Sequence, residues 1–305
     1  MTSEQPSLFD GDESSANELK AAAELWALTQ LPGIGNARAL RLSSGFASWD
    51  ELVDASPAAR RQVAGAEIDY VPAMPVPRVP EGVQLCGYFD DDYPDALRAI
   101  KNPPVALWVR GEIARSTPSV AVVGAREASD WAIQMAGSIA ADASELGVAV
   151  VSGLAFGIDI AAHRSALTSG GRTIAVLGSG VDVPTPREHL ADAERILETG
   201  GALISEVPLG SAPNPRTLVA RNRIQSGLSF ATIVVECGLK SGTMQTAKFA
   251  VEQGRRLCVP SPEAHDESEM NAGSRSLLDI GVGNVAAERL RSREDLHELL
   301  RSAAS

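Results

Sequence analysis

Short runs of apolar residues alternate with amphipathic segments over the C-terminal two thirds of the chain. Most runs end in glycine or a small polar residue, and the segments between them are long enough for helices. Strands that are apolar on both faces are typical of a parallel sheet covered by helices on both sides. We therefore predict an α/β domain with a doubly wound, mostly parallel sheet. Its strands should lie at residues 120–124, 148–153, 173–180, 202–206, 231–236 and 257–260.

The N-terminal part of the chain shows a helical pattern instead. Apolar residues recur at helical spacing on both sides of a turn that holds Gly33 and Gly35, and a proline-rich stretch follows from Pro72 to Pro80. The turn resembles a helix-hairpin-helix. We predict a disordered acidic tail at 1–18, an all-helical module at 19–70, a linker at 71–84, the α/β domain at 85–285, and a C-terminal helix at 286–305 without a winged-helix domain.

Small or polar residues stand at the C-terminal ends of five predicted strands. Ligands bind beyond the carboxyl ends of parallel strands, where the winding of the sheet reverses, so these residues should face one crevice. Backbone amides and hydroxyls in such a crevice suit a phosphate group. The residues include Gly124, Arg126, Ser152, Gly153 and Glu236.

The segment Arg221, Asn222 and Arg223 is the strongest local indication of binding. No acidic residue occurs between Val207 and Val235, so neither guanidinium has an acidic neighbour in the sequence. Two arginines beside the free amides of a helix start are typical of a clamp on backbone phosphates. A solvated arginine face is the alternative interpretation.

A second anion site is predicted at the next strand end. Ser241, Gly242 and Thr243 open a helix, and Thr246 follows one turn later. Lys240, just before them, adds positive charge. Ordinary helix capping is the alternative role for Ser241. The GxxxxGK[ST] pattern of magnesium-assisted nucleotide hydrolysis is absent, and no GxGxxG follows a strand, so we expect no cofactor.

Asp159 and His163 lie one helical turn apart, shortly after Gly157. A carboxylate and an imidazole at this spacing can form a hydrogen bond, which predicts a polar pair that anchors the loop. A catalytic pair is the alternative. No metal ligand set accompanies it, because the other histidines, His189, His265 and His297, are scattered.

The charge of the chain argues against a generally basic nucleic-acid coat. There are 27 Lys and Arg against 39 Asp and Glu, a formal charge of -12. Residues 1–20, 81–100 and 261–270 together account for this excess, and the remainder is neutral. A locally positive surface around the arginines is therefore compatible with the acidic total.

The cellular location is indicated by what the sequence lacks. The three cysteines, Cys86, Cys237 and Cys258, are far apart and odd in number, which favours a reducing compartment. No apolar run reaches the length of a membrane span, and the N-terminus is acidic rather than basic. We expect a cytoplasmic protein without membrane contact.

Several motifs, taken together, resemble one known family in order and spacing. They are VVGAR, SGLAFGIDIAAH, TIAVLGSGVD, LISEVPLG, ARNRIQSGLS, VVE and KSGTMQTA. Over about Leu85 to Gly281 the chain resembles the DprA/Smf family of DNA-processing proteins, and LPGIGNARAL resembles the family's N-terminal helical module.

The resemblance implies a Rossmann-like fold and a homodimer that binds single-stranded DNA without sequence specificity. It also implies loading of the RecA recombinase in homologous recombination or natural transformation, with no established catalytic step. The implied phosphate-binding residues are Arg126, Ser152, Gly153, Arg221, Asn222, Arg223, Lys240, Ser241 and Gly242. Supporting roles fall to Gly124, Gly157, Asp159, His163, Glu236 and Thr246.

The chain departs from the family pattern near this site. Phe156 stands where the family often has Lys or Arg, and Leu218 and Val219 stand where it usually has an aromatic residue and proline. Thr185-Pro186 replaces a Tyr-Pro, and Pro260-Ser261 replaces a Pro-Gly. These changes predict weaker DNA binding, unless Phe156 itself stacks on a base.

Two alternative functions stay open at this point. The core also resembles LOG-type nucleotide hydrolases, in which Glu236 would be an acid/base candidate and Asp159 with His163 an orienting pair, although the PGGxGTxxE signature is absent. A third hypothesis is a divergent family member whose acidic surface serves protein contacts, with reduced DNA binding.

Overall fold

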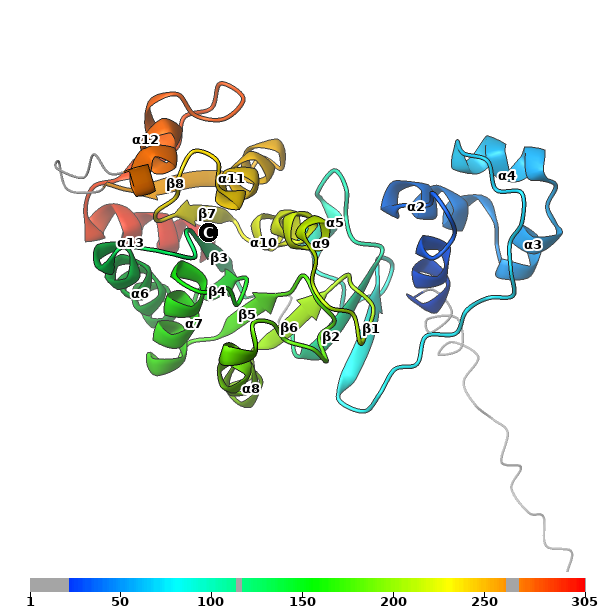
Figure 1. Cartoon of the computed structure of the whole chain (residues 1–305), viewed down its shortest axis with the longest axis horizontal. Helices are drawn as coiled ribbons and strands as arrows, with labels where there is room; N and C mark the ends of the chain where they lie inside the picture. Colours follow the sequence, from blue (N-terminus) through cyan, green and yellow to red (C-terminus); the bar gives the residue numbers. More distant parts are fainter. Residues whose placement is uncertain (1–21, 114–116, 262–268, 305) are drawn as a thin grey trace, which may run out of the picture.

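A nine-stranded sheet forms the centre of the molecule (Figure 1). The computed structural model describes residues 22–113, 117–261 and 269–304, so the tail predicted at 1–18 and most of the acidic block at 261–270 lie outside the described residues. The strand order is β1-β2-β6-β5-β4-β3-β7-β8-β9. The strands are β1 Val83–Gly87, β2 Ala106–Gly111, β3 Ser119–Val123, β4 Ala149–Ser152, β5 Thr173–Val176, β6 Ala202–Ser205, β7 Ala231–Val234, β8 Arg256–Pro260 and β9 Glu288–Leu290.

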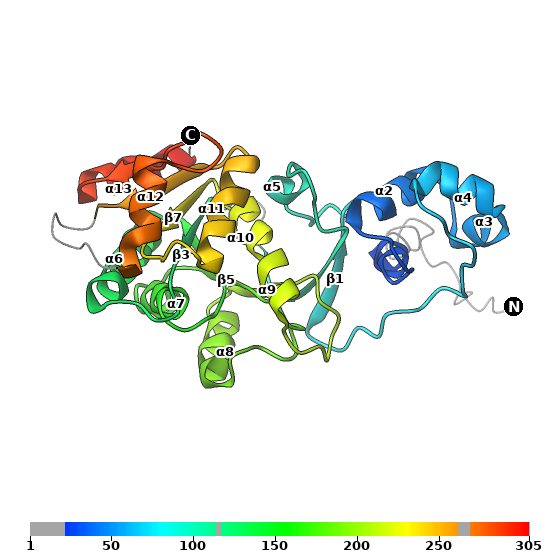
Figure 2. The same ribbon diagram turned by 45° about the horizontal axis from the view of Figure 1, so that its top comes forward.

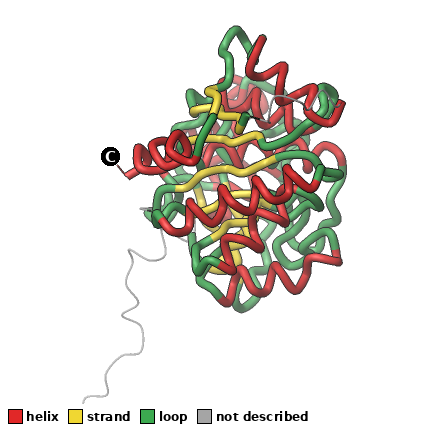
Figure 3. Tube along the Cα trace, turned by 90° about the vertical axis from the view of Figure 1, so that its left-hand side faces the viewer, coloured by secondary structure: helices red, strands yellow, loops and turns green. Residues whose placement is uncertain are grey.

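Strands β3 to β9 run parallel, and β1 and β2 extend the sheet antiparallel beside β6. Alternate residues of each central strand face opposite layers. Val120 and Val122 of β3 pack in one core cluster, and Ala121 and Val123 pack in another on the other face. Both faces are buried because helices cover both, as the side view in Figure 3 shows.

The helices divide between the two faces according to these clusters. Helices α6 Asp130–Glu145, α7 Ile158–Thr168, α8 Leu190–Glu198 and α13 Arg293–Arg301 cover one face. Helices α5 Asp95–Arg98, α10 Asn222–Leu228, α11 Gly242–Glu252 and α12 Ala272–Asp279 cover the other. The short helix α9, Pro215–Ala220, has no buried residue. The doubly wound α/β class is confirmed.

Four helices form a module beside the sheet (Figure 2), at residues 22–29, α2 Asn36–Gly45, α3 Trp49–Asp54 and α4 Pro57–Ala64. Leu25, Leu42 and Leu52 contribute to a core of its own. Arg60 is buried there and donates to four backbone carbonyl oxygens. We call these residues, 22–64, the helical module.

The helical module contacts the sheet at the start of β2 and the end of β6. The rings of Trp26 and Trp108 meet edge to face, with centroids 6.1 Å apart. Asn36 Nδ2 donates to Glu206 Oε1 at 2.9 Å, and Val105 N donates to Asn36 Oδ1 at 3.4 Å. The module is therefore joined to the carboxyl edge of the parallel strands by both apolar and polar contacts.

The six predicted apolar runs correspond to β3 through β8, whereas β1, β2 and β9 are not predicted. Residues 83–84 of the predicted linker belong to β1, and β9 precedes α13 in the segment predicted as helix alone. The other domain boundaries stay predictions. Among the described residues, no helix is both long and apolar enough to cross a membrane.

Candidate phosphate-binding pocket

A cavity of about 410 Å³ opens at the carboxyl edge of the sheet. The chain winds from β3 through β4 and β5 to β6, and then returns to place β7 on the other side of β3. This reversal is the topological switch point, where open α/β sheets bind ligands. We call this cavity the switch-point pocket. It is lined by Val123, Gly124, Ala125, Arg126, Ala155, Asp159, Leu218, Val219, Arg221, Asn222, Gln225, Ser241, Gly242, Thr243 and Thr246.

The turn after β3 forms one wall of the switch-point pocket. Gly124 packs so tightly against Ile158 and Glu236 that a Cβ would collide with them, and Gly157 lies against the carbonyl of Ala125 with φ of +73°. These close approaches fix the backbone that carries Arg126, which is exposed. The pocket mouth therefore has a cation on a rigid turn.

Glu236 holds the other side of this turn. Its carboxylate is fully buried and accepts hydrogen bonds from Ser129 N at 2.7 Å and Ser129 Oγ at 2.9 Å. Ser129 in turn caps α6 by accepting from Ala132 N. Glu236 thus positions the turn, and its oxygens do not line the pocket.

Arg221 lies at the back of the switch-point pocket and connects the ends of β4 and β5 with the start of α7. Its Nη1 donates to Val176 O at 2.8 Å, and its Nη2 is 3.7 Å from Asp159 Oδ2. The amide oxygen of Gln225 accepts from both Arg221 Nη1 and Gly153 N when that amide is oriented to satisfy its neighbours. A Cβ on Gly153 would overlap the guanidinium, so only glycine fits at that strand end.

The Arg221–Asp159 pair is buried, with both side chains 8% exposed. Burial lowers the pKa of Arg221 and raises the pKa of Asp159, while the charge of each opposes the shift of the other. The negative charge that Asp159 contributes next to Arg221 leaves Arg126 as the exposed cation on the wall of the pocket.

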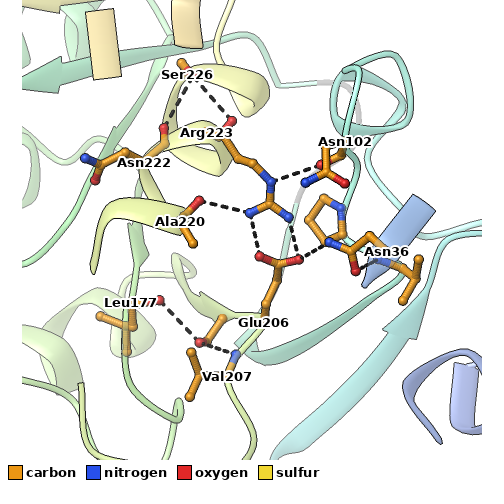
Figure 4. A network of polar contacts seen from close by, with 12 residues as sticks. Asn36, Asn102, Leu177, Glu206, Val207, Ala220, Asn222, Arg223 and Ser226 are labelled. Atoms are coloured by element: carbon orange, nitrogen blue, oxygen red, sulfur yellow. Dashed lines mark hydrogen bonds and ion pairs between the residues drawn. The ribbon is translucent and has the colours of Figure 1, made fainter. Parts of the chain in front are cut away.

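Arg223 points away from the switch-point pocket, which corrects the prediction that it lines the phosphate site. Its Nη1 and Nη2 bind the two oxygens of Glu206 at 2.5 and 2.6 Å, and its Nε donates to Asn102 O at 3.0 Å (Figure 4). Asn36 of the helical module reaches the same carboxylate. We call Asn36, Glu206 and Arg223 the Glu206 junction. Its arginine links the helical module to the sheet and does not line the switch-point pocket.

The start of α11 forms another part of the pocket wall and is bonded to the turn that carries Arg126. Ser241 caps the helix by accepting from Thr243 N at 3.0 Å, and Thr243 Oγ1 donates to Gly124 O at 3.0 Å. The amide of Gly242 makes no hydrogen bond within the part of the chain that the structure describes, and the space above its Cα is open. A free amide at a helix N-terminus attracts an anion.

Asn222 and Thr246 complete this wall, and Lys240 lies next to it. Asn222 Nδ2 donates to Gly242 O at 3.3 Å and so links α10 to the start of α11. Thr246 is buried on the pocket floor, whereas Lys240 is exposed outside the lining.

Asp159 and His163 do not form the predicted pair. Asp159 faces Arg221 and accepts from Ala155 N, whereas His163 Nδ1 contacts Thr173 Oγ1 at 2.6 Å. Burial lowers the pKa of His163 to about 3, so its imidazole is neutral. Ser152 also turns inward, where its Oγ donates to Val122 O at 2.7 Å. Both side chains belong to the core behind the pocket.

The switch-point pocket brings together Gly124, Arg126, Asp159, Arg221, Asn222, Ser241, Gly242 and Thr246 of the predicted set. Sequence reasoning missed Gln225, although it lies only two residues after ARNR. Thr243, which the sequence places at the opening of the helix, also lines the pocket. Leu218 and Val219 give one wall an apolar surface. Phe156 is 45% exposed and packs edge to face with His189. In the described ranges, no group of three His, Cys, Asp or Glu could hold a metal ion.

A doubly wound sheet with an open pocket at its switch point defines a Rossmann-like fold, and an exposed cation and a free amide line that pocket. The profile of the DNA recombination-mediator protein A family matches residues 84–300. The chain therefore belongs to this family, which is the DprA/Smf family.

Curated relatives carry the same family names. The chain is 44% identical over 180 residues to Protein Smf of Escherichia coli, and 39% identical over 209 residues to the putative DNA processing protein DprA of Mycobacterium tuberculosis. These alignments cover 58% and 67% of this chain, and 48% and 51% of the relatives. The chain thus spans about half the length of these two proteins.

Two solved structures share the fold and a quarter of the sequence. DNA processing protein A of Streptococcus pneumoniae aligns with a TM-score of 0.73 and 27% identity, over 90% of this chain and 96% of that one. DNA processing protein A of Helicobacter pylori aligns with a TM-score of 0.62 and 25% identity, over 72% of this chain and 96% of that one. The Helicobacter structure is described as showing a single-stranded DNA binding mode.

Proposed function

We propose that the switch-point pocket binds a backbone phosphate of single-stranded DNA without reading its sequence. The observation that carries this proposal is that the exposed Arg126 and the free amide of Gly242 line the same pocket at the switch point. A guanidinium and a helix N-terminus stabilise a phosphate but distinguish no base. Family membership favours DNA as the source of that phosphate.

Replacing Arg126, rather than Arg221 or Arg223, is the suitable test of this proposal. Arg223 is paired with Glu206, and Arg221 connects the ends of two strands with α7, so replacing either one would disturb the fold as well as binding. Arg126 is exposed and has no ion-pair partner within the described residues. Its removal should leave the fold unchanged.

Fluorescence anisotropy with a labelled oligonucleotide of twelve thymidines tests the pocket directly. Arg126→Ala should weaken binding about tenfold or more and reduce the slope of log affinity against log salt by about one. Arg301→Ala, an exposed arginine outside the pocket, is the matched control and should change neither quantity. Equal losses in both variants, or equal affinity for a duplex of the same length, would contradict the proposal.

We further propose that the protein is a homodimeric mediator that loads RecA on single strands, as the family resemblance implies. Light scattering should give twice the mass of one chain. Adding the protein should shorten the lag of RecA filament formation on single-stranded DNA. A monomer, or an unchanged lag at saturating protein, would contradict the corresponding part. Cytoplasmic location stays a prediction.

A nucleotide hydrolase would use the pocket differently. The Glu236 carboxylate is occupied by Ser129 and buried, and Asp159 and His163 are separated from one another by their partners. Incubation with nucleoside monophosphates should therefore release no free base. Release of base, or saturable mononucleotide binding without any single-strand binding, would favour that alternative.

A further inference from the structure

A second cavity lies on the same edge of the sheet, between the helical module and the ends of β5 and β6. Its volume is about 280 Å³. We call it the interdomain groove. Its lining comes from Trp26, Thr29 and Asn36 of the module and from Val105, Ala106, Leu177, Glu206, Val207, Pro208, Thr217, Ala220 and Arg221 of the α/β part.

The interdomain groove and the switch-point pocket share one lining residue, Arg221. Helix α9 stands between the two cavities as a narrow ridge. Leu218 and Val219 line the pocket, whereas Thr217 and Ala220 line the groove. Because α9 buries none of its residues, both of its flanks are accessible. A chain bound in the pocket can cross this ridge and enter the groove.

The chemistry of the groove differs from that of the pocket. Both oxygens of Glu206 are already engaged by Arg223, and one of them also by Asn36. Arg221 is the cation of its lining, and its guanidinium is buried. A free phosphate would therefore meet a carboxylate and no exposed positive charge.

A nucleobase fits the lining of the interdomain groove better than a phosphate does. Trp26 is partly exposed and lines the groove together with apolar residues such as Val105, Leu177 and Pro208. Thr29 and Thr217 add hydroxyl groups that can bond to a base or a sugar. Aromatic side chains of this kind bind bases of any sequence by stacking.

We propose that the interdomain groove receives a nucleobase of the same single strand whose phosphate occupies the switch-point pocket, with Trp26 as its apolar platform. The inference rests on the proposed function of the pocket. The helical module thereby becomes part of the DNA-binding surface, although it holds few basic residues.

Filling the groove from its exposed flank tests the proposal without touching the pocket. Ala220→Phe should weaken binding of a twelve-thymidine strand roughly tenfold, because a stacked base is lost, and should leave binding of a two-thymidine competitor unchanged. Ala212→Phe, at an exposed position outside both cavities, is the matched control and should bind both like the wild type. Wild-type affinity of Ala220→Phe for both lengths would overturn the inference.

Tryptophan fluorescence gives an independent readout. Stacking of a base near Trp26 should quench emission on addition of the twelve-thymidine strand, and Trp26→Phe, which keeps a ring in the module, should abolish that quenching. The same fractional quenching in Trp26→Phe would overturn the inference. If Arg126→Ala still weakens binding in that case, the proposed function of the pocket stands. Absence of any single-strand binding would instead remove the proposed function itself.

Discussion

The switch-point pocket and the Glu206 junction are built from neighbouring residues, yet they use their arginines in opposite ways. Arg221 and Arg223 are separated by one residue and both are buried. Arg221 lines an open cavity with its nearest carboxylate 3.7 Å away, whereas Arg223 binds both oxygens of Glu206. The difference arises at the start of α10, where residues two positions apart point to different sides of the helix and so meet the ends of different strands.

Two arginines that are close in the sequence therefore do not by that fact form a phosphate clamp. The absence of acids from Val207 to Val235 suggested two available guanidiniums. The acids come instead from β6 and α7, which the sheet places beside them. A buried charge needs such a partner, because its desolvation is otherwise uncompensated.

Removing the acid of the junction should have the largest effect. Glu206→Ala leaves the buried Arg223 without its counter-charge, so we expect the free energy of unfolding to fall by about 3–5 kcal/mol in urea titrations. Glu194→Ala, which breaks the exposed pair with Arg110, is the control and should cost at most about 1 kcal/mol. Similar losses for the two variants would mean that the junction contributes no more than a surface ion pair.

Crowding the back of the pocket should have the next largest effect. Gly153→Ala places a methyl group on the Arg221 guanidinium, so we expect a loss of about 1–3 kcal/mol in unfolding free energy together with weaker single-strand binding. Gly35→Ala has open space around the added methyl group and a negative φ, and should cost less than about 1 kcal/mol. An unchanged stability of Gly153→Ala would show that Arg221 does not need its present position.

Lowering the pH should reduce the free energy of unfolding, because it protonates His163 in the core behind the pocket. Because burial lowers its pKa from 6.5 to about 3, the neutral imidazole stabilises the fold fully above pH 6.5, and this contribution is lost as the pH falls toward 3. Between pH 7.5 and 5.5 the wild type should lose about 1.4 kcal/mol more than His163→Gln does, by urea titration at each pH. Parallel pH profiles of the two proteins would contradict this assignment.

The smallest effect is expected at Lys240, which is exposed outside the pocket lining. Lys240→Ala should change the free energy of unfolding by no more than about 0.5 kcal/mol and weaken single-strand binding only severalfold, mainly at low salt. Anisotropy titrations at two salt concentrations measure this. A loss as large as that of Arg126→Ala would extend the phosphate site beyond the pocket.

The sequence was sufficient for the central sheet because β3 to β8 are apolar on both faces and separated by helical segments. Strands β1 and β9, at the two edges of the sheet, were not predictable in this way. In β1, exposed and buried positions mix, and β9 has three residues of which one is buried. Such strands are recognised by their pairing partners, β2 and β8, rather than by their own composition.

For the pocket too, the sequence predicted some residues to be neighbours but not all of their contacts. Strand ends and helix starts identified Arg126, Ser241 and Gly242 correctly as neighbours in space. The two members of a predicted pair contact different partners, as Arg221 and Arg223 do, and as Asp159 and His163 do. Which partner each side chain meets depends on groups that are distant in the sequence. Thr173 of β5 and Glu206, which directly follows β6, supply those groups, and no local sequence pattern predicts these contacts.

The contact between Asn36 and Glu206 spans 170 positions of the chain, and Arg223 completes the junction later still. A ribosome adds about 5–20 residues per second, so roughly 10–40 s separate the synthesis of Asn36 from that of Arg223. Throughout this interval the nascent helical module exists without the surface on which it will dock. The stability of the module during this interval depends on its own core. There, Arg60 donates hydrogen bonds to four backbone carbonyl oxygens, all of which are synthesised before the sheet.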